Sequence, residues 1–283
     1  MYSCKEYAAH IKEKIRKAIE ESGISPKLVV LQIGDNPSSN SYIKGKKKDC
    51  EEVGIKCEHY VFGDKIHMNR LIDEINELNS DESVSGIILQ LPVPDHIDVK
   101  TIQNLISPTK DVDGFSAKSK FQPCTPLGVI NYLKFIEYDF TGKNACVVGR
   151  SDIVGKPLAK MLLDLNCTVT ICHSKTPEHH LAFHMNDSDI VFTCINEIEK
   201  FDHMFLNPLS DIIDIGLGIG TDGKLHGNIH RDTVKMFKES ADPLNQVFIS
   251  GVGGVGLLTR ATLLTNTLKA YYINNNISAP EWL

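Results

Sequence analysis

The sequence predicts an α/β protein of two domains, each with a mostly parallel β-sheet covered by helices. Strand and helix patterns alternate in the first part of the chain and again from residue 144 onwards. This βα alternation is typical of parallel sheets with helices on their faces. A stretch marked by prolines, from Pro92 to Pro126, consists of loops in this interpretation and separates the two blocks.

The first block predicts three helices alternating with three strands. The opening helix places Ile11, Ile15 and Ile19 on one face. Serines are expected to cap the second helix, and Gly54 is expected to end it. The expected elements are a helix over 6–23, a strand over 27–34, a helix over 36–54, a strand over 55–62, a helix over 69–81 and a strand over 84–94.

The second block begins with a strand, a glycine turn and a helix over residues 144–166. The remaining expected elements are strands over 167–174, 188–195 and 211–218, and a glycine-rich loop with a long helix over 251–275. That last helix can return to the first domain, because chain termini often lie close together. We therefore expect one domain of residues 1–122 with about 258–283, and a second domain of residues 123–257.

Composition excludes several classes of protein. The 283-residue chain has a net charge of −6, which offers no basic field to nucleic acid or anionic lipid. The N-terminal segment has no uninterrupted apolar run, so neither a signal peptide nor a membrane helix is expected. The eight cysteines form no C-x-x-C pair, and we expect reduced thiols in a cytoplasmic protein and no metal site.

The segment "VVGRSDIVGKP" lies where a dinucleotide-binding turn is expected, after a strand and at the start of a helix. Gly149 allows a sharp turn, and Gly155 allows close packing of helix and strand. Ser151 and the helix N-terminus can hold phosphate oxygens. The usual G-x-G-x-x-G spacing is absent, so a purely structural turn is the alternative.

The end of the next strand favours NADP over NAD. A site that binds a free ribose 2′-hydroxyl tends to carry an acid there, but this strand ends in "HSKT". Ser174 and Lys175, with Arg150 at the adjacent turn, suit a 2′-phosphate instead. The alternative is that these are solvated loop residues.

Four polar residues stand out in the first block. Tyr42 and Lys46 are four residues apart on an expected helix and share one face. Lys46 belongs to the run "KGKKK", and such runs are usually solvated. Gln90 interrupts an apolar strand, where an amide needs a partner. Asp113, in "KDVDGF", follows on an extended segment that makes a poor calcium loop.

Seven motifs together resemble the bifunctional methylenetetrahydrofolate dehydrogenase/cyclohydrolase family over nearly the whole chain. They are "GDNPSSNSYIKGKKKDCEEVGI", "GIILQLPVP", "KDVDGF", "PCTPLGV", "VVGRSDIVGKP", "CHSKT" and "GGVG", in the family's order. The resemblance implies a folate-binding N-terminal domain, a Rossmann-type, NADP-binding second domain, an active-site cleft between them and a homodimer. Its substrates are one-carbon derivatives of tetrahydrofolate.

The resemblance also assigns roles by position. Tyr42 is similar to the residue that stacks on the folate ring, Lys46 to the catalytic lysine, Gln90 to its partner and Asp113 to the acid that binds the pterin. The remaining implied substrate contacts are Leu89, Leu91, Gly253, Gly254, Val255 and Gly256. The implied NADP contacts are Thr125, Gly149, Arg150, Ser151, Ser174 and Leu217.

These residue types fit the expected chemistry. Hydride transfer from the methylene carbon to the nicotinamide mainly needs two aligned molecules. Water then attacks the methenyl cation, and a lysine beside it can exchange protons near neutral pH.

Several segments depart from the family pattern. "SGVGGVGLLT" keeps the glycines of the substrate loop but lacks its prolines, and "DIGLGIG" replaces the usual G-I-N. Asn228 stands where an aspartate is common, and "TCINEIEKF" lacks an expected glycine. Three alternatives therefore stay open: a member with one activity, a non-catalytic binding paralogue, and a shikimate-type dehydrogenase. The last does not explain Tyr42, Lys46, Gln90 and "KDVDGF" together.

Overall fold

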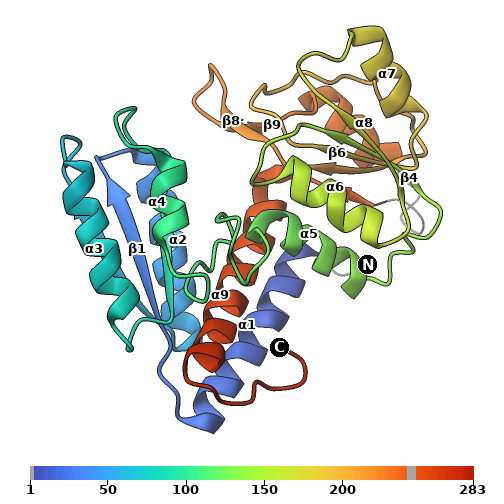
Figure 1. The fold of residues 1–283 in the computed structure, drawn as a ribbon. Helices are drawn as coiled ribbons and strands as arrows, with labels where there is room; N and C mark the ends of the chain where they lie inside the picture. Colours follow the sequence, from blue (N-terminus) through green and yellow to red (C-terminus); the bar gives the residue numbers. More distant parts are fainter. Residues whose placement is uncertain (1–2, 241–246) are drawn as a thin grey trace. The chain divides into compact units, whose positions relative to one another are not determined.

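The computed structural model describes residues 3–240 and 247–283, which fold into two compact units. The first unit contains residues 8–124 and 260–283, and the second contains residues 125–259 with the described residues up to Tyr7. Each unit has a sheet and an apolar core of its own (Figure 1).

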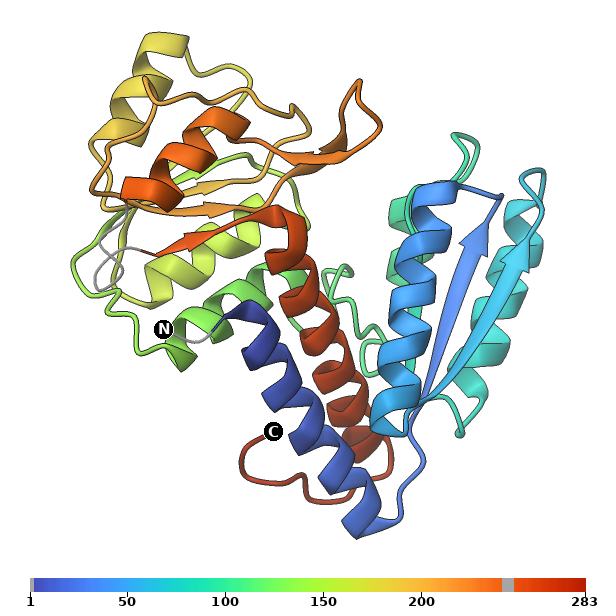
Figure 2. The ribbon, with the colours of Figure 1, turned by 180° about the vertical axis from the view of Figure 1, so that it is seen from behind.

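The first unit is built on a three-stranded parallel sheet with the order β2-β1-β3. Its elements are α1 (Cys4–Ser22), β1 (Lys27–Ile33), α2 (Pro37–Val53), β2 (Lys56–Phe62), α3 (Met68–Ser80), β3 (Gly86–Leu89), α4 (Val99–Leu105) and α9 (Gly256–Asn274). The unit boundaries fall within α1 and α9. These two helices run side by side (Figure 2).

Alternate residues of β1 divide the core of the first unit between the two faces of the sheet. Leu28 and Val30 pack with residues of α1, α2 and α9. Val29 and Leu31 pack with residues of α3 and α4. Successive side chains of a strand point to opposite faces, so burial on both faces explains why β1 reads as a continuous apolar run.

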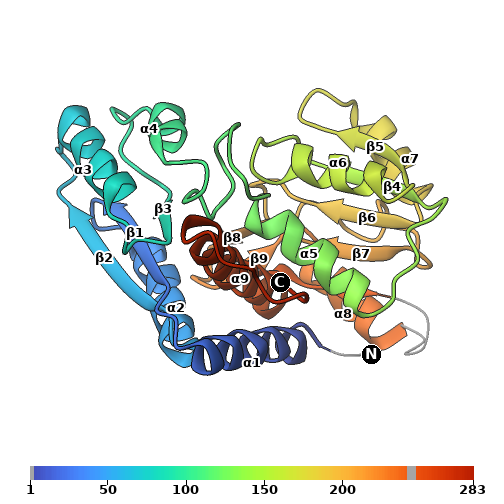
Figure 3. The same cartoon turned by 60° about the horizontal axis from the view of Figure 1, so that its bottom comes forward.

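The second unit contains a five-stranded parallel sheet with the order β10-β7-β6-β4-β5 (Figure 3). Its elements are α5 (Cys124–Phe135), β4 (Asn144–Val148), α6 (Gly155–Asp164), β5 (Thr168–Cys172), α7 (Glu178–Asn186), β6 (Ile190–Thr193), β7 (Asp211–Asp214), β8 (Leu217–Ile219), β9 (Leu225–Gly227), α8 (Arg231–Ser240) and β10 (Phe248–Ile249). The chain leaves β4 toward β5 on one side and returns to β6 on the other. This reversal is the switch point at which doubly wound sheets bind ligands.

The structure corrects four expectations about single elements. The stretch from Pro92 to Pro126 is not all loop, because it contains α4. The strand expected over 84–94 ends at Leu89, so Gln90 follows the strand. The strand expected over 211–218 divides into β7 and the first strand of an antiparallel hairpin, β8–β9. Asn36, rather than a serine, caps α2, and its side chain accepts from the Ser39 amide.

Among the described residues, no helix combines the length and the apolar character needed to cross a membrane.

Candidate functional site

The first unit brings Lys46 and Gln90 together. Lys46 lies on α2, and its Nζ donates to the Gln90 Oε1 at 3.0 Å. The Gln90 Nε2 donates to the Leu91 carbonyl at 2.7 Å, and this second bond fixes the amide with its oxygen toward the lysine. The amide thus has the partner that the sequence required of it. One lysine of "KGKKK" has a specific contact, while Lys44 and Lys48 are exposed.

The Asp113 carboxyl interacts electrostatically with the Lys46 ammonium. Burial raises the pKa of the Asp113 carboxyl, and the Lys46 ammonium and a hydrogen bond from the Cys124 thiol partly offset that rise. Gly114 follows with a φ of 73°. A side chain there would overlap the backbone of Gln122, so the turn after Asp113 requires glycine.

The other charged residues of "KDVDGF" hold this segment in place. Lys110 is buried, and its ammonium donates to the carbonyl oxygens of Leu78 at 3.0 Å, Asn79 at 2.8 Å and Asp81 at 2.8 Å. These carbonyls belong to the C-terminal end of α3, which favours a cation. Asp111 accepts from the Ser116 amide at 2.8 Å. Its carboxylate therefore stabilises the loop that follows and is not directed at Lys46.

Cys124 was not among the residues singled out by sequence. It is buried, and its Sγ donates to the Val112 carbonyl at 3.2 Å. The Asn266 Nδ2 donates to the same carbonyl at 2.9 Å and lies 3.5 Å from the Cys124 Sγ. The signal in the sequence was a cysteine inside the motif "PCTPLGV" and an amide between the apolar residues of the helix over 256–274.

The other residues predicted for the substrate divide between the two units. Tyr42 is exposed on α2, one turn before Lys46. Leu89 is buried at the end of β3, and Leu91 is half-buried beyond Gln90. The glycine loop, Gly253–Gly256, belongs to the second unit. Gly253 has a φ of 78°, so this turn also requires glycine.

The predicted nucleotide contacts follow successive strands of the second sheet. Gly149, Arg150 and Ser151 come directly after β4, Ser174 comes after β5, and Leu217 comes after β7. Because these strands are parallel, their carboxyl ends share one edge of the sheet. This is the edge at which doubly wound proteins bind dinucleotides.

Close backbone contacts explain both glycines of the turn after β4. Gly149 has a φ of 132°, and a side chain there would overlap Cys194 at the end of β6. A side chain on Gly155 would overlap the Gly149 carbonyl. The Ser151 Oγ accepts from the amides of Val154 at 3.2 Å and Gly155 at 3.4 Å, and so caps the first turn of α6.

Cationic and hydroxyl side chains follow β4 and β5 at this edge of the sheet. Arg150, Ser174 and Lys175 are exposed, and the Lys175 amide donates to the His173 Nδ1 at 3.2 Å. Hydroxyl and cationic groups of the kind that can bind phosphate are therefore accessible to solvent at this edge. Thr125, the remaining predicted contact, accepts from the Thr259 hydroxyl at 3.1 Å.

A polar network joins the ends of β6 and β7 in the second unit. Asp214 is buried, and its Oδ1 accepts from the Thr193 hydroxyl and the Asn228 amide, each at 2.9 Å. Burial raises the pKa of the Asp214 carboxyl to about 6, against the lowering effect of these hydrogen bonds. The Asn228 side chain bonds the Ile195 backbone through both its amide groups. Asn228, a departure from the family pattern, therefore has a structural role, because its side chain hydrogen-bonds the backbone.

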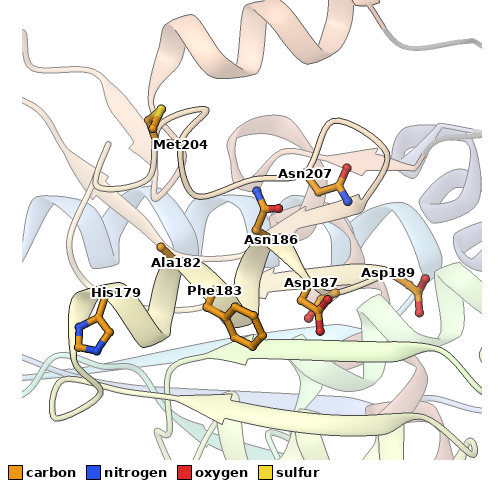
Figure 4. A pocket seen from close by; sticks show the side chains of 9 residues that line it. His179, Ala182, Phe183, Asn186, Asp187, Asp189, Met204 and Asn207 are labelled. Atoms are coloured by element: carbon orange, nitrogen blue, oxygen red, sulfur yellow. The ribbon is translucent and has the colours of Figure 1, made fainter.

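A pocket of about 590 Å³ lies elsewhere in the second unit, between α7 and the segment that precedes β7 (Figure 4). Phe183, Asp187, Asp189 and Met204 are among its lining residues, and none of the residues predicted from sequence is. In the part of the chain that the structure describes, no cluster of three or more His, Cys, Asp and Glu side chains could hold a metal ion.

Two family models match the chain in the order of its motifs. Residues 2–113 match the tetrahydrofolate dehydrogenase/cyclohydrolase catalytic domain, and residues 123–275 match the NAD(P)-binding domain of the same family. The chain belongs to this family. The resemblance found from the motifs is confirmed, and the shikimate-type alternative is wrong.

Relatives of the tetrahydrofolate dehydrogenase/cyclohydrolase family match nearly the whole chain. The bifunctional protein FolD of Rickettsia massiliae is 40% identical over 276 residues, which are 94% of this chain and 93% of that protein. The crystal structure of the bifunctional enzyme FolD from Campylobacter jejuni is 36% identical, covers 96% of this chain and 98% of its own, and has a TM-score of 0.88. The Trypanosoma brucei FolD structure, complexed with NADP cofactor and inhibitor, is 25% identical with a TM-score of 0.87 over 96% of this chain and 97% of its own.

Proposed function

We propose that this protein oxidises 5,10-methylenetetrahydrofolate to the 5,10-methenyl derivative with NADP, and then hydrolyses that product to 10-formyltetrahydrofolate. Family membership supports both activities. The single observation that carries the proposal is the 3.0 Å hydrogen bond between the Lys46 ammonium and the Gln90 amide, with Asp113 beside them. Enzymes of this class are oxidoreductases and hydrolases of one-carbon metabolism.

The first unit supplies the groups that bind folate in this proposal. Tyr42 stacks on the ring system, and the Asp113 carboxylate accepts from the N–H groups at the pterin edge. Leu89 and Leu91 are the proposed contacts on either side of Gln90, and of the two only the half-buried Leu91 has appreciable accessible surface. Gly253 to Gly256, in the second unit, are further proposed substrate contacts, and three of these four residues have no side chain to keep a ligand away from the backbone.

The hydrolytic step gives Lys46 its role. Water attacks the methenyl carbon, a C–O bond forms, and the water loses a proton that the Lys46 amine can accept. The C–N5 bond then breaks, N5 takes a proton, and the formyl group stays on N10. Gln90 orients the amine without neutralising it, whereas a carboxylate in its place would form an ion pair and hold the proton on the amine.

The second unit fits NADP at the carboxyl edge of its sheet. Gly149 allows the turn after β4 to pack closely on Cys194, while Arg150, Ser151 and Ser174 are the proposed contacts of the phosphate oxygens. Leu217 and Thr125 are the proposed contacts nearer the nicotinamide. When bound, NADP accepts the hydride that leaves the methylene carbon.

One assay tests the proposed function directly. The purified protein, methylenetetrahydrofolate and NADP are mixed, and the absorbance of NADPH and of the methenyl product is followed. We expect NADPH to form and the methenyl absorbance to decay faster than in buffer alone. Formation of NADPH without accelerated decay would leave a dehydrogenase only. Absence of both signals would contradict the proposal.

We also propose a domain division, an assembly and a location. Residues 1–122 and 258–283 form the folate-binding domain, and residues 123–257 form the NADP-binding domain. The protein works as a homodimer, which the family resemblance supports. It resides in the cytoplasm, which its eight free cysteines support. Sedimentation analysis of the purified protein tests the homodimer.

A further inference from the structure

We propose that Arg260 is a positioning residue for Lys46, acting through a notch in α2 that Gly45 creates. This inference rests on the proposed function, because it concerns the lysine of the hydrolytic step. Tyr42, Gly45, Lys46 and Asp49 lie on one face of α2 at helical spacing. Gly45 and Asp49 therefore lie within one helical turn of Lys46.

The first observation concerns Gly45. Glycine destabilises the interior of a helix relative to alanine, so its presence in the middle of α2 needs a reason. Here a side chain on Gly45 would overlap the Nη1 atom of Arg260 and crowd its Cζ at 3.3 Å. The planar guanidinium thus occupies the space that the missing side chain leaves. A lysine ammonium has no such flat surface.

The second observation is the ion pair behind this contact. The Arg260 Nε lies 2.9 Å from the Asp49 Oδ2, an ionic contact without hydrogen-bond geometry, and Lys12 donates to the Asp49 Oδ1 at 2.5 Å. The Asp49 side chain is only 5% exposed, so its two cations are its main compensation. Lys12 also contacts Glu52 at 2.8 Å. Three helices, α1, α2 and α9, are joined at this carboxylate.

These contacts fix α2 on the side that carries Lys46. The Lys46 Nζ must stay at 3.0 Å from Gln90, a residue of the segment after β3. A small displacement of the turn of α2 from Gly45 to Asp49, which lies beyond Tyr42, would lengthen that bond, and misplacement by about 1 Å can reduce a rate by about a hundredfold. Arg260 has no direct part in the reaction. It keeps the helix, and therefore the amine, in register.

If these contacts of Arg260 with Gly45 and Asp49 (the Arg260 tether) position Lys46, their loss should reduce cyclohydrolase activity selectively. Hydride transfer needs no proton from the enzyme, whereas hydrolysis depends on the place of the Lys46 amine. We expect Arg260→Met to lower kcat of the cyclohydrolase reaction by about tenfold to a hundredfold, with KM for the methenyl substrate changed less than about threefold. Dehydrogenase kcat should fall by less than about threefold. A merely structural residue would lower both activities together.

A double-mutant cycle makes the test specific to the notch. Gly45→Ala displaces the guanidinium and should reproduce the selective loss, and the double variant Gly45→Ala/Arg260→Met should be no worse than either single one. Such non-additivity identifies coupled residues. Arg260→Lys, which keeps a cation for Asp49, should fall between the wild type and Arg260→Met. Lys269→Met, farther along α9, is the control.

The possible results distinguish a failure of the Arg260 proposal from a failure of the proposed function. Wild-type cyclohydrolase activity in Arg260→Met, additive losses in the double variant, or equal losses of both activities would overturn the tether while leaving the proposed function intact. A wild-type protein without cyclohydrolase activity would instead overturn the proposed function, and this inference with it. If Arg260→Met fails to fold, Gly45→Ala and Arg260→Lys carry the same comparison.

Discussion

Lys46 is the residue on which the proposed hydrolytic step depends. Lys46→Met keeps the approximate length and removes the amine. Because general acid–base groups typically contribute 10²–10⁴-fold, we expect near-complete loss of cyclohydrolase activity with measurable dehydrogenase activity. The decay of methenyl absorbance against buffer measures the first activity, and NADPH formation measures the second.

Its neighbours in the same run provide the controls. Lys44 and Lys48 are exposed, so Lys44→Met and Lys48→Met should be nearly silent. Tyr42 should affect both steps, because it positions the ring for each. If Lys46→Met hydrolyses methenyltetrahydrofolate as fast as the two controls, the catalytic assignment is wrong.

Asp113 carries the prediction for folate binding. Its carboxyl lies beside Lys46 and Cys124, and burial raises its pKa. Asp113→Ala should weaken folate binding and leave NADP binding nearly unchanged, as measured by calorimetric titration with each ligand. The exposed Asp95 provides the control variant Asp95→Ala. An equal loss for both ligands would point to a turn aspartate that only stabilises its loop.

At the residue scale, spacing and context predicted some contacts and missed others. Lys46 and Tyr42 share a helical face because four residues separate them, and Gln90 needed a partner because its neighbours are apolar. Cys124 could not be assigned in this way, since its contacts come from Val112 and Asn266, far away in the chain. Only the folded structure brings such segments together.

At the element scale, the C-terminal end of α3 depends on Lys110. Its buried ammonium donates to three carbonyl oxygens, and hydrogen bonds to charged groups contribute about 1.5–3 kcal/mol each. Since such contributions are not additive, we expect Lys110→Met to reduce the free energy of unfolding by about 2–4 kcal/mol. Urea unfolding followed by circular dichroism measures this.

The exposed Lys118 gives the matched control, and Lys118→Met should change the free energy of unfolding by less than about 0.5 kcal/mol. Lys110→Met should also raise KM for folate, because Lys110 anchors the segment that carries Asp113. Equal stability of the two variants would show that water replaces the lost bonds.

The turn after β4 carries the prediction for the cofactor. Arg150 stands next to Ser151 at the sheet edge, and we expect it to contact the 2′-phosphate that distinguishes NADP from NAD. A charge-assisted contact is worth about 1.5–3 kcal/mol, so Arg150→Ala should weaken NADP roughly tenfold or more and NAD much less. Lys160→Ala, on the exposed side of α6, is the control. Equal initial use of both cofactors by the unmodified protein would refute this preference.

Strongly patterned elements were predictable and short ones were not. β1 is a continuous apolar run because both faces of the strand are buried. α1 has a helical period of apolar residues because one of its faces is buried. α4 has only seven residues, too few to repeat a helical pattern clearly. The β8–β9 hairpin was missed because its first strand continues an apolar run that began in β7.

At the scale of the whole molecule, the alternation of strands and helices was sufficient to predict two α/β blocks, because parallel strands require crossover helices. The exact strand order could not be predicted. Order depends on which faces pack together, and alternation alone allows several arrangements. Family resemblance supplied the function, since the same folds host many chemistries.

The stability of the molecule should depend on pH through Asp214, which joins β7 to β6. Its pKa is raised from 3.8 to about 6 in the folded protein, so folding favours the protonated form. The resulting contribution to stability is fully present below about pH 4 and is lost as pH rises through about 6. Asp214→Asn removes this titration and nearly keeps the shape of the side chain. Between about pH 4 and pH 7, the free energy of unfolding of Asp214→Asn should therefore rise relative to wild type by roughly 2–3 kcal/mol. Urea midpoints by circular dichroism across this range measure the difference, and the exposed Asp187→Asn should show none. A constant difference between Asp214→Asn and wild type at every pH would mean that the Asp214 carboxyl titrates in the folded protein as it does in the unfolded chain.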